Sequence, residues 1–257
     1  MTDSGERRVT RHVGHEEPRG EHVGYTGDVT VGGPRDLRVL DEVEIRKLAV
    51  GPSDNNAYLL TCRRSGAQLL VDAAAEPDHL LELVREGSPS ARLDLVVTTH
   101  RHLDHTRALA SLGTTTGAPL AAGAPDADAI TETTGGAISR PLHDGDTLVV
   151  GHLTIEVIGL RGHTPGSVTL AYREPEHASA PEAVPGRVHL FTGDSLFPGG
   201  VGSTSNDPDR FALLYADVTE KLFDRFDDAT WVYPGHGADT TLGAERPHLD
   251  EWRERGW

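Results

Sequence analysis

The sequence predicts a layered α/β sandwich, and three observations carry this prediction. Short runs rich in Val, Ile and Leu are separated by segments that contain Gly and Pro, as expected of strands joined by turns. Amphipathic stretches with helical periodicity lie between several of these runs. Two consecutive runs flank Gly151 so closely that a hairpin is expected, which argues against a simple alternating parallel fold.

The expected strands begin at Val43. In the run 153–158, Leu153, Ile155 and Val157 alternate with polar residues, which indicates a strand with one buried face. The runs expected to form strands are 43–50, 57–62, 68–72, 93–98, 147–150, 153–158, 168–172, 188–192 and 230–233.

Helices are expected between the strands. The clearest spans 208–226, where Asp207 can cap the N-terminus and Pro208 suits the first turn. Its apolar stripe is expected to pack in the core and consists of Phe211, Leu214, Tyr215, Val218 and Leu222. The other expected helices are 77–86 and 103–112.

The length of 257 residues, with 37% hydrophobic residues, is enough to bury one large core, so we expect a single domain over 25–257. Residues 1–24 are charged and lack periodicity, which predicts a flexible N-terminal tail. This tail has no apolar segment typical of a secretory signal, and no run approaches the ~20 apolar residues that span a bilayer. Cytoplasm is therefore the expected location.

The charge balance indicates the class of partner. With 40 acidic and 24 basic residues the formal charge is -16, which disfavours nucleic acid and anionic membranes as partners. A small-molecule substrate is expected instead. The sequence does not indicate an oligomeric state.

The most informative stretch follows the buried run 93–98 and carries four ligand-type side chains: His100, His102, Asp104 and His105. Side chains of an extended segment repeat every two residues, so His100 and His102 are expected to point the same way, with Asp104 and His105 opening the next helix. Imidazoles and carboxylates without thiolates suit zinc, iron or manganese. Four such residues within six positions favour a metal site over buried core histidines.

Three further polar residues each follow an apolar run and lie beside glycine: His163, Asp194 and His236. Loops at strand ends on one sheet edge can meet, and glycine allows the backbone to approach a bound ion closely. Each signal is weak alone, because Gly-Asp and Gly-His pairs also occur in ordinary turns. Their order after the histidine motif makes the set specific.

This set of residues resembles the metallo-β-lactamase-fold superfamily, and within it the branch that contains glyoxalase II, over roughly residues 43–240. The resemblance implies a four-layer αββα sandwich with a two-metal site. It assigns the first ion to His100, His102 and His163, the second to Asp104, His105 and His236, and a bridging role to Asp194. Asp72 matches an acidic position that supports the ligands, by accepting a hydrogen bond from a ligating imidazole; an ordinary turn carboxylate is the alternative.

The expected chemistry is hydrolysis of a small acyl thioester. Two divalent ions ~3.5–4 Å apart can share a hydroxide that attacks the carbonyl, and Asp104 is the candidate catalytic residue that orients it. Zinc is the expected metal, with iron or manganese as alternatives. Ser195 lies outside any Gly-x-Ser-x-Gly elbow, so it is not expected to be a nucleophile.

Other reactions on the same scaffold stay open. An iron-dependent persulfide dioxygenase would use only the equivalents of His100, His163 and Asp194, and a lactonase or phosphodiesterase would use the same metal site. A non-catalytic metal-binding module ranks last, because such a module is expected to have lost ligands. Glyoxalase II continues after its last metal histidine into a helical region that binds glutathione, whereas this chain ends soon after His236, so the thiol carrier is undecided.

The remaining candidates carry weaker signals. The glycine-rich segment 198–203 lacks the lysine of a P-loop and is interpreted as a flexible loop beside the active site. Cys62 lies in an apolar run and is expected to be a buried inert thiol. Solvent or packing roles are expected for His143, His152, His177, His189 and His248, and the candidates for substrate contact are Arg161, Arg210 and Tyr215.

Overall fold

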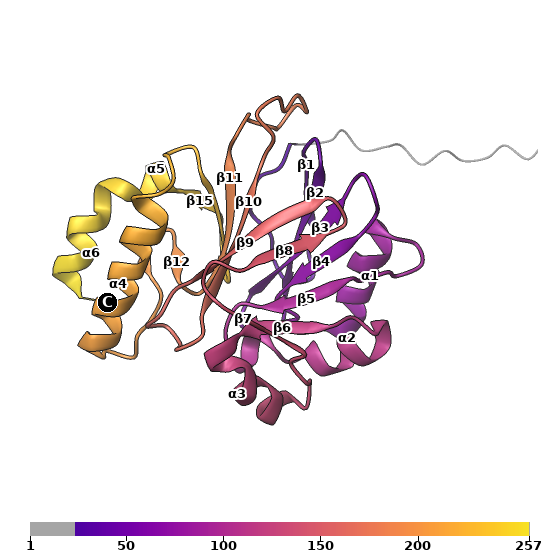
Figure 1. Cartoon of the computed structure of the whole chain (residues 1–257), viewed down its shortest axis with the longest axis horizontal. Helices are drawn as coiled ribbons and strands as arrows, with labels where there is room; N and C mark the ends of the chain where they lie inside the picture. Colours follow the sequence, from indigo (N-terminus) through magenta and orange to yellow (C-terminus); the bar gives the residue numbers. More distant parts are fainter. Residues whose placement is uncertain (1–23, 257) are drawn as a thin grey trace, which may run out of the picture.

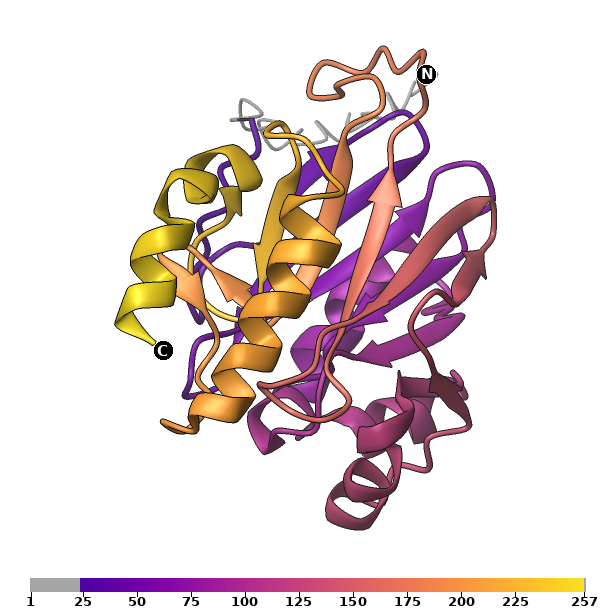
Figure 2. The same cartoon turned by 60° about the vertical axis from the view of Figure 1, so that its left-hand side comes forward.

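The computed structural model describes residues 24–256. Its architecture is an αββα sandwich, in which two sheets face each other and helices cover the outer face of each (Figures 1 and 2). The αββα prediction is therefore confirmed. The tail predicted over 1–24 lies outside the described residues except for Gly24.

The first sheet contains seven strands that lie side by side in chain order. Its strands are β1 (Asp36–Val39), β2 (Val43–Val50), β3 (Asn55–Cys62), β4 (Gln68–Val71), β5 (Leu95–Thr98), β6 (Leu120–Gly123) and β7 (Arg140–Leu142). Strands β1 to β4 pair antiparallel, and β4 to β7 pair parallel. The parallel strands are joined by crossover helices, namely α1 (Pro77–Gly87), α2 (Leu109–Thr116) and α3 (Ala124–Thr134).

The second sheet has six strands in the order β15-β14-β11-β10-β9-β8. Its strands are β8 (Thr147–Val150), β9 (Leu153–Gly159), β10 (Val168–Arg173), β11 (Val188–Gly193), β14 (Trp231–Pro234) and β15 (Thr240–Thr241), and a separate hairpin is formed by β12 (Leu196–Phe197) and β13 (Gly200–Val201). Strands β8 and β9 form the hairpin expected around Gly151. The parallel pair β11 and β14 is joined through α4 (Pro208–Val218) and the π-helical turn η2 (Thr219–Phe223).

The C-terminal part adds α5 (Leu242–Glu245), the 3-10 turn η3 (Arg246–His248) and α6 (Leu249–Arg255), which lie beside α4 on the outer side of the second sheet (Figure 1). Trp252 of α6 is buried and packs edge-on against Phe223. Among the described residues, no helix is long and apolar enough to cross a membrane.

The main core lies between the two sheets. Tyr58 of the first sheet packs edge-on against Phe191 and Tyr233 of the second, with ring centroids 5.4 and 5.5 Å apart. The alternation expected in β9 is present, because Leu153, Ile155 and Val157 all point into this core. Further apolar clusters fill the space between each sheet and its helices.

The expected helix over 103–112 is wrong as one continuous element. A 3-10 turn, η1 (Leu103–His105), is capped by Thr106, and α2 begins only at Leu109. The reason is a change of partners: the amides of Arg107 and Ala108 bind carbonyls of 73–74 after β4, not the carbonyls one helical turn earlier. His105 is consequently held beside β4 rather than on a regular helix.

Candidate metal centre

The predicted ligands lie at the edge of the sandwich where β4 and β5 end in parallel. Asp72 follows β4 with a left-handed φ of 59°, and its carboxylate accepts hydrogen bonds from Thr99 N at 2.7 Å and Thr99 Oγ1 at 2.8 Å. Thr99 opens the loop that carries the histidine motif. The bonds to Asp72 therefore fix where that loop leaves β5.

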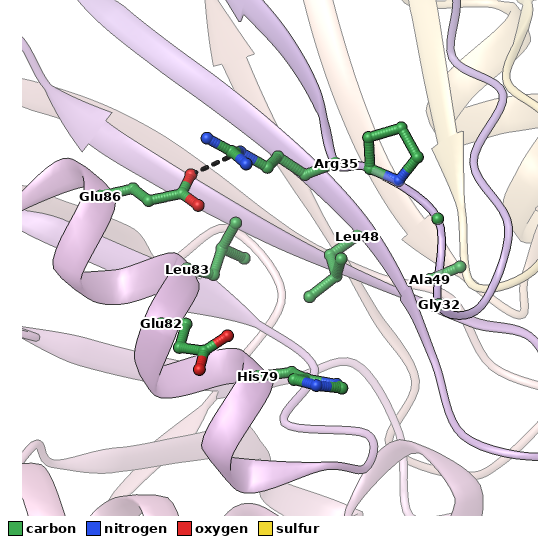
Figure 3. A pocket seen from close by; sticks show the side chains of 10 residues that line it. Gly32, Arg35, Leu48, Ala49, His79, Glu82, Leu83 and Glu86 are labelled. Atoms are coloured by element: carbon green, nitrogen blue, oxygen red, sulfur yellow. Dashed lines mark ion pairs between the residues drawn. The ribbon is translucent and has the colours of Figure 1, made fainter. Parts of the chain in front are cut away.

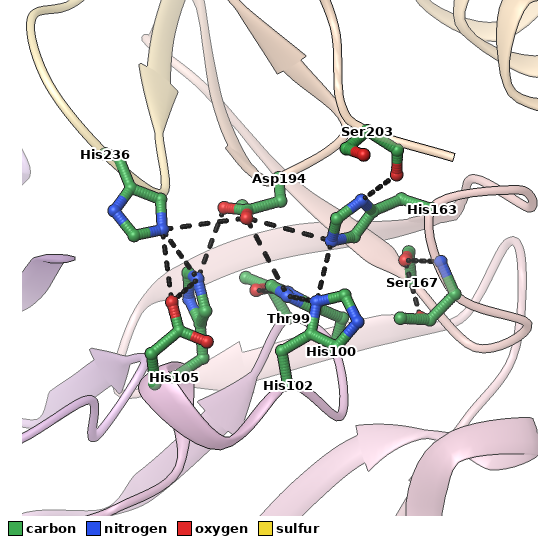
Figure 4. A network of polar contacts seen from close by, with 12 residues as sticks. Thr99, His100, His102, His105, His163, Ser167, Asp194, Ser203 and His236 are labelled. Atoms are coloured by element: carbon green, nitrogen blue, oxygen red, sulfur yellow. Dashed lines mark hydrogen bonds and ion pairs between the residues drawn. The ribbon is translucent and has the colours of Figure 1, made fainter. Parts of the chain in front are cut away.

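A first group of four side chains converges beyond this point, with its donor atoms all within 4.8 Å of one another: His100, His102, His163 and Asp194 (Figure 4). His102 Nδ1 lies 3.0 Å from both His100 Nε2 and His163 Nε2. Asp194 Oδ2 lies 3.7 Å from His163 Nε2 and 4.0 Å from His100 Nε2.

A second group adjoins the first and contains Asp104, His105 and His236. His105 Nε2 and His236 Nε2 are 3.2 Å apart, and Asp104 Oδ2 lies 3.7 and 3.4 Å from them. Asp194 touches this group as well, because its Oδ1 is 3.2 Å from His105 Nε2 and its Oδ2 is 3.6 Å from His236 Nε2. One carboxylate thus faces both groups, as Figure 4 shows.

In four of the five histidines, the ring nitrogen that points away from the centre has a partner. His100 Nδ1 donates to Thr99 Oγ1 at 3.0 Å, and His105 Nδ1 donates to Asp72 Oδ2 at 2.8 Å. The Nδ1 atoms of His163 and His236 each donate at 2.8 Å to a backbone carbonyl, of residues 203 and 53 respectively. A proton held on Nδ1 leaves the lone pair of Nε2 facing the centre, where a metal ion can bind it.

The electrostatics of the cluster favour a cation. Burial lowers the pKa of every histidine of the first group, which keeps these imidazoles neutral. Burial opposes ionisation of Asp194, but the imidazoles of His105 and His236 outweigh it and hold the pKa of this carboxyl far below its usual range. Burial also opposes the charge on His105, yet Asp72 and Asp194 raise its pKa to about 10.

The donor set fits two divalent ions. Asp194 Oδ1 is buried without a hydrogen-bond partner among the described residues, which is costly for an ionised oxygen unless a cation compensates it. Nitrogen and oxygen donors without a thiolate suit zinc, iron or manganese. All seven predicted ligands meet in this one place.

Comparison with known proteins agrees with this geometry. The family profile described as Metallo-beta-lactamase superfamily matches residues 50–180. The chain belongs to the metallo-beta-lactamase superfamily. This membership confirms the family predicted from the histidine motif.

Similar proteins within the superfamily include enzymes and solved structures. A hydroxyacylglutathione hydrolase from Polaromonas sp. is 33% identical over 71% of this chain, and the match spans 62% of that relative's length. The crystal structure of ETHE1 from Myxococcus xanthus is 28% identical with a TM-score of 0.64, covering 80% of this chain and 82% of that one. A protein crystallised in a di-iron-bound form is 31% identical with a TM-score of 0.57, covering 78% of this chain and 96% of that one.

The loop that carries His163 is held by α4. Arg210 Nε donates to Gly162 O at 2.9 Å, and Arg210 Nη2 donates to His163 O. Gly162 has a φ of 126°, and a Cβ added there would overlap the carbonyl oxygen of Arg210. Arg210, a candidate for substrate contact in the sequence, therefore positions a predicted ligand of this superfamily site. The other two candidates also have protein partners: Arg161 pairs with Asp217, and the Tyr215 hydroxyl donates to the carbonyl of residue 249.

The loop that carries His236 is held from β2 and β3. Asn56 Nδ2 and Lys47 Nζ donate to Gly237 O at 2.9 and 2.8 Å. Lys47 is fully buried and pairs with Asp239 at 2.7 Å. These bonds fix the backbone next to His236.

The glycine-rich segment 198–203 borders the same site. Its residues 200–201 form β13, which pairs with β12. A Cβ at Gly202 would overlap Asp194 O, and the carbonyl of Ser203 accepts the bond from His163. This segment supplies backbone contacts to the first group and no side-chain donor.

Other features that the sequence singled out lie away from the cluster or have partners of their own. Cys62 is buried, and His189 is buried between Tyr233 and Glu174. A hollow of about 200 Å³ between the segment 32–35 and α1 is bridged by the ion pair of Arg35 with Glu86 (Figure 3). None of the seven predicted ligands lines this hollow.

Sequence reasoning missed Asn55, the first residue of β3. Its side chain is fully buried, and its Nδ2 lies 3.1 Å from Asp104 Oδ2, 3.2 Å from His105 Nε2 and 3.3 Å from His236 Nε2. An isolated β-bridge pairs Asn55 with His236, so a contact far apart in sequence creates this position. The pair of asparagines at 55–56 carries no ligand signature in the sequence.

Proposed function

We propose that the protein is a dinuclear metal-dependent hydrolase that cleaves small acyl thioesters. The observation that supports this proposal most is the pair of adjoining donor groups that share Asp194. In this proposal the first group would hold one ion, the second group would hold the other, and Asp194 would serve both. Zinc is the proposed metal, and iron or manganese would suit the same donors.

In the proposed reaction, Asp104 has a role distinct from that of the bound ions. When bound, two divalent ions would supply an activated water and would polarise the carbonyl of the substrate. Asp104 is about one quarter exposed, so its carboxylate can face both the second group and an entering substrate. Burial opposes the ionisation of Asp104, but the amide of Asn55 and the imidazole of His105 lower its pKa, so it stays able to accept a proton or a hydrogen bond. We therefore assign Asp104 the role of orienting the attacking water.

The thioester class rests on similarity. The relative from Polaromonas is named a hydroxyacylglutathione hydrolase, and an acyl group on the glutathione sulfur is a thioester. The two carboxylates and five imidazoles contributed by this chain are sufficient to hold a dinuclear site without a serine or cysteine nucleophile. Thioester hydrolysis accordingly ranks above lactone or phosphodiester hydrolysis.

The test is free-thiol release from a hydroxyacyl thioester of glutathione, measured in air and under anaerobic conditions. Equal rates are expected, because hydrolysis consumes no oxygen. Activity that requires a persulfide, iron and dissolved oxygen would replace hydrolysis by the dioxygenase reaction.

The second group provides an independent test. His236→Ala is expected to lower the rate by orders of magnitude, since both ions act together. The matched control is His143→Ala, a histidine whose side chain is 70% exposed. A His236→Ala enzyme with the wild-type rate would contradict the two-ion proposal.

A further inference from the structure

Asn55 occupies a position that the proposed two-ion site does not yet explain. Its side-chain Nδ2 contacts one donor atom of each member of the second group, at 3.1 to 3.3 Å. Its Oδ1 is buried and has no hydrogen-bond partner among the described residues. A buried amide oxygen left unpaired costs free energy, so this arrangement calls for a reason.

The spacing of the four atoms supplies that reason. The three donor atoms of the second group are 3.2, 3.4 and 3.7 Å apart, and the terminal amide atom of Asn55 lies 3.1, 3.2 and 3.3 Å from them. Six nearly equal distances among four points define a nearly regular tetrahedron. The point equidistant from its corners lies about 2.0 Å from each atom, which is the usual length of a bond from zinc to nitrogen or oxygen.

The chemistry decides which amide atom belongs there. An NH2 group directed at a cation is repelled, whereas an amide oxygen is a good neutral ligand for a divalent ion. Rotation of the carboxamide by half a turn exchanges Nδ2 and Oδ1 and moves no other group. The hydrogen bond from Nδ2 to Asp104 Oδ2 would then be lost. The bound ion would stabilise the charge of this carboxylate in its place.

We propose that Asn55 is an additional protein ligand of the second ion and binds it through Oδ1. This inference rests on the proposed dinuclear site but not on the reaction catalysed there. Asn55 brings no charge, so the second ion gains a donor while the two carboxylates that face it, of Asp104 and Asp194, remain its only anionic ligands from the described residues.

The experiment measures zinc binding by the full-length protein in competition with a chelator, so that the affinities of both ions are obtained separately. Asn55→Leu keeps the approximate shape and removes both polar atoms, while Asn55→Asp keeps an oxygen. The matched control is Thr169→Val in β10, which also removes a buried side-chain oxygen that has no hydrogen-bond partner among the described residues. A crystal structure of the zinc-loaded wild-type protein gives the distance from Oδ1 to the metal.

The expected result is a loss of at least roughly tenfold in second-ion affinity for Asn55→Leu, with the first ion unchanged. Asn55→Asp and Thr169→Val should retain both ions, and Oδ1 should lie about 2.0–2.4 Å from the metal. The inference is overturned if folded Asn55→Leu binds the second zinc as tightly as wild type, or if Oδ1 lies beyond about 3 Å. If Asn55→Leu does not fold, weaker second-ion binding by folded Asn55→Asp overturns it. A wild-type protein that binds a single ion would instead refute the proposed dinuclear site itself.

Discussion

Replacement of Asp72 by Asn tests how the fold prepares the second group for metal. Asp72 is buried, and its two oxygens accept from Thr99 N, Thr99 Oγ1 and His105 Nδ1 at 2.7 to 2.8 Å. Its φ of 59° lies in the left-handed region, which Asn tolerates better than most residues. The substitution therefore changes the hydrogen bonding without imposing backbone strain.

The magnitude follows from the single acceptor oxygen of the carboxamide. If that oxygen stays on Thr99 N, the NH2 group faces His105 Nδ1, and the ring must carry its proton on Nε2. A protonated Nε2 has no lone pair for an ion. If the amide turns the other way, its NH2 group meets the Thr99 N–H instead, which costs about 1–3 kcal/mol for unmatched donors. Loss of such a supporting partner typically lowers metal affinity by roughly 10–100-fold, which is about 1.4–2.7 kcal/mol.

The assay is zinc binding in competition with a chelator, with the first and second ions resolved. Glu174→Gln is the matched control, because Glu174 is also a buried carboxylate that accepts from a histidine, His189 Nε2, at 2.8 Å. This control should destabilise the fold and leave both zinc affinities near those of the wild type. The reasoning is refuted if Asp72→Asn folds and binds its second zinc within about twofold of the wild-type affinity.

Further predictions concern the supports of the site. Arg210→Met should weaken binding of the first ion by roughly tenfold, since it releases the His163 loop, and zinc titration checks this. Lys47→Met should lower the free energy of unfolding by about 3–5 kcal/mol in urea titration, because it leaves the buried carboxylate of Asp239 without its cationic partner. Burial lowers the pKa of His189 to about 4, below ~6.5 in the unfolded chain, so the unfolded chain binds more protons in this window. Burial of neutral His189 therefore contributes about 3 kcal/mol to the free energy of unfolding above pH ~6.5, and this contribution is lost as the pH falls to 4. In urea titrations at several pH values, His189→Gln should reduce the dependence of the free energy of unfolding on pH in this range.

The long strands and the positions of the side chains that converge at the site could be predicted from the sequence, because both depend on local patterns. The histidine motif follows β5 of the first sheet, whereas Asp194 and His236 follow strands β11 and β14 of the second, and all of them lie at the same edge of the sandwich. The order of these motifs along the chain indicated the superfamily. The elements that the sequence did not predict lack such patterns. β6 reads Leu-Ala-Ala-Gly and contains no β-branched residue, and α3 buries only Asp126, Ala127 and Ile130, so neither shows a clear periodicity.

Asn55 escaped prediction for a different reason. Nothing in its neighbours indicates a ligand, because its position depends on the bridge between β3 and the loop after β14, which lie far apart in the chain. The break in the helix predicted over 103–112 has the same origin, since the amides of 107–108 bind the chain after β4. Local propensity cannot register contacts that only the tertiary structure creates.

The supports of the imidazoles divide in the same way. His105 and His100 depend on the side chains of Asp72 and Thr99, whereas His163 and His236 donate to backbone carbonyls of residues 203 and 53. A carbonyl is supplied by any residue, so the identities of positions 53 and 203 carry no information about the site. What matters there is where the backbone runs, and this is set by the β12–β13 hairpin and by the bridge of β3 to the His236 loop. Two of these four histidines are therefore held by side chains whose identity the sequence shows, and two are held by backbone carbonyls whose position only the fold determines.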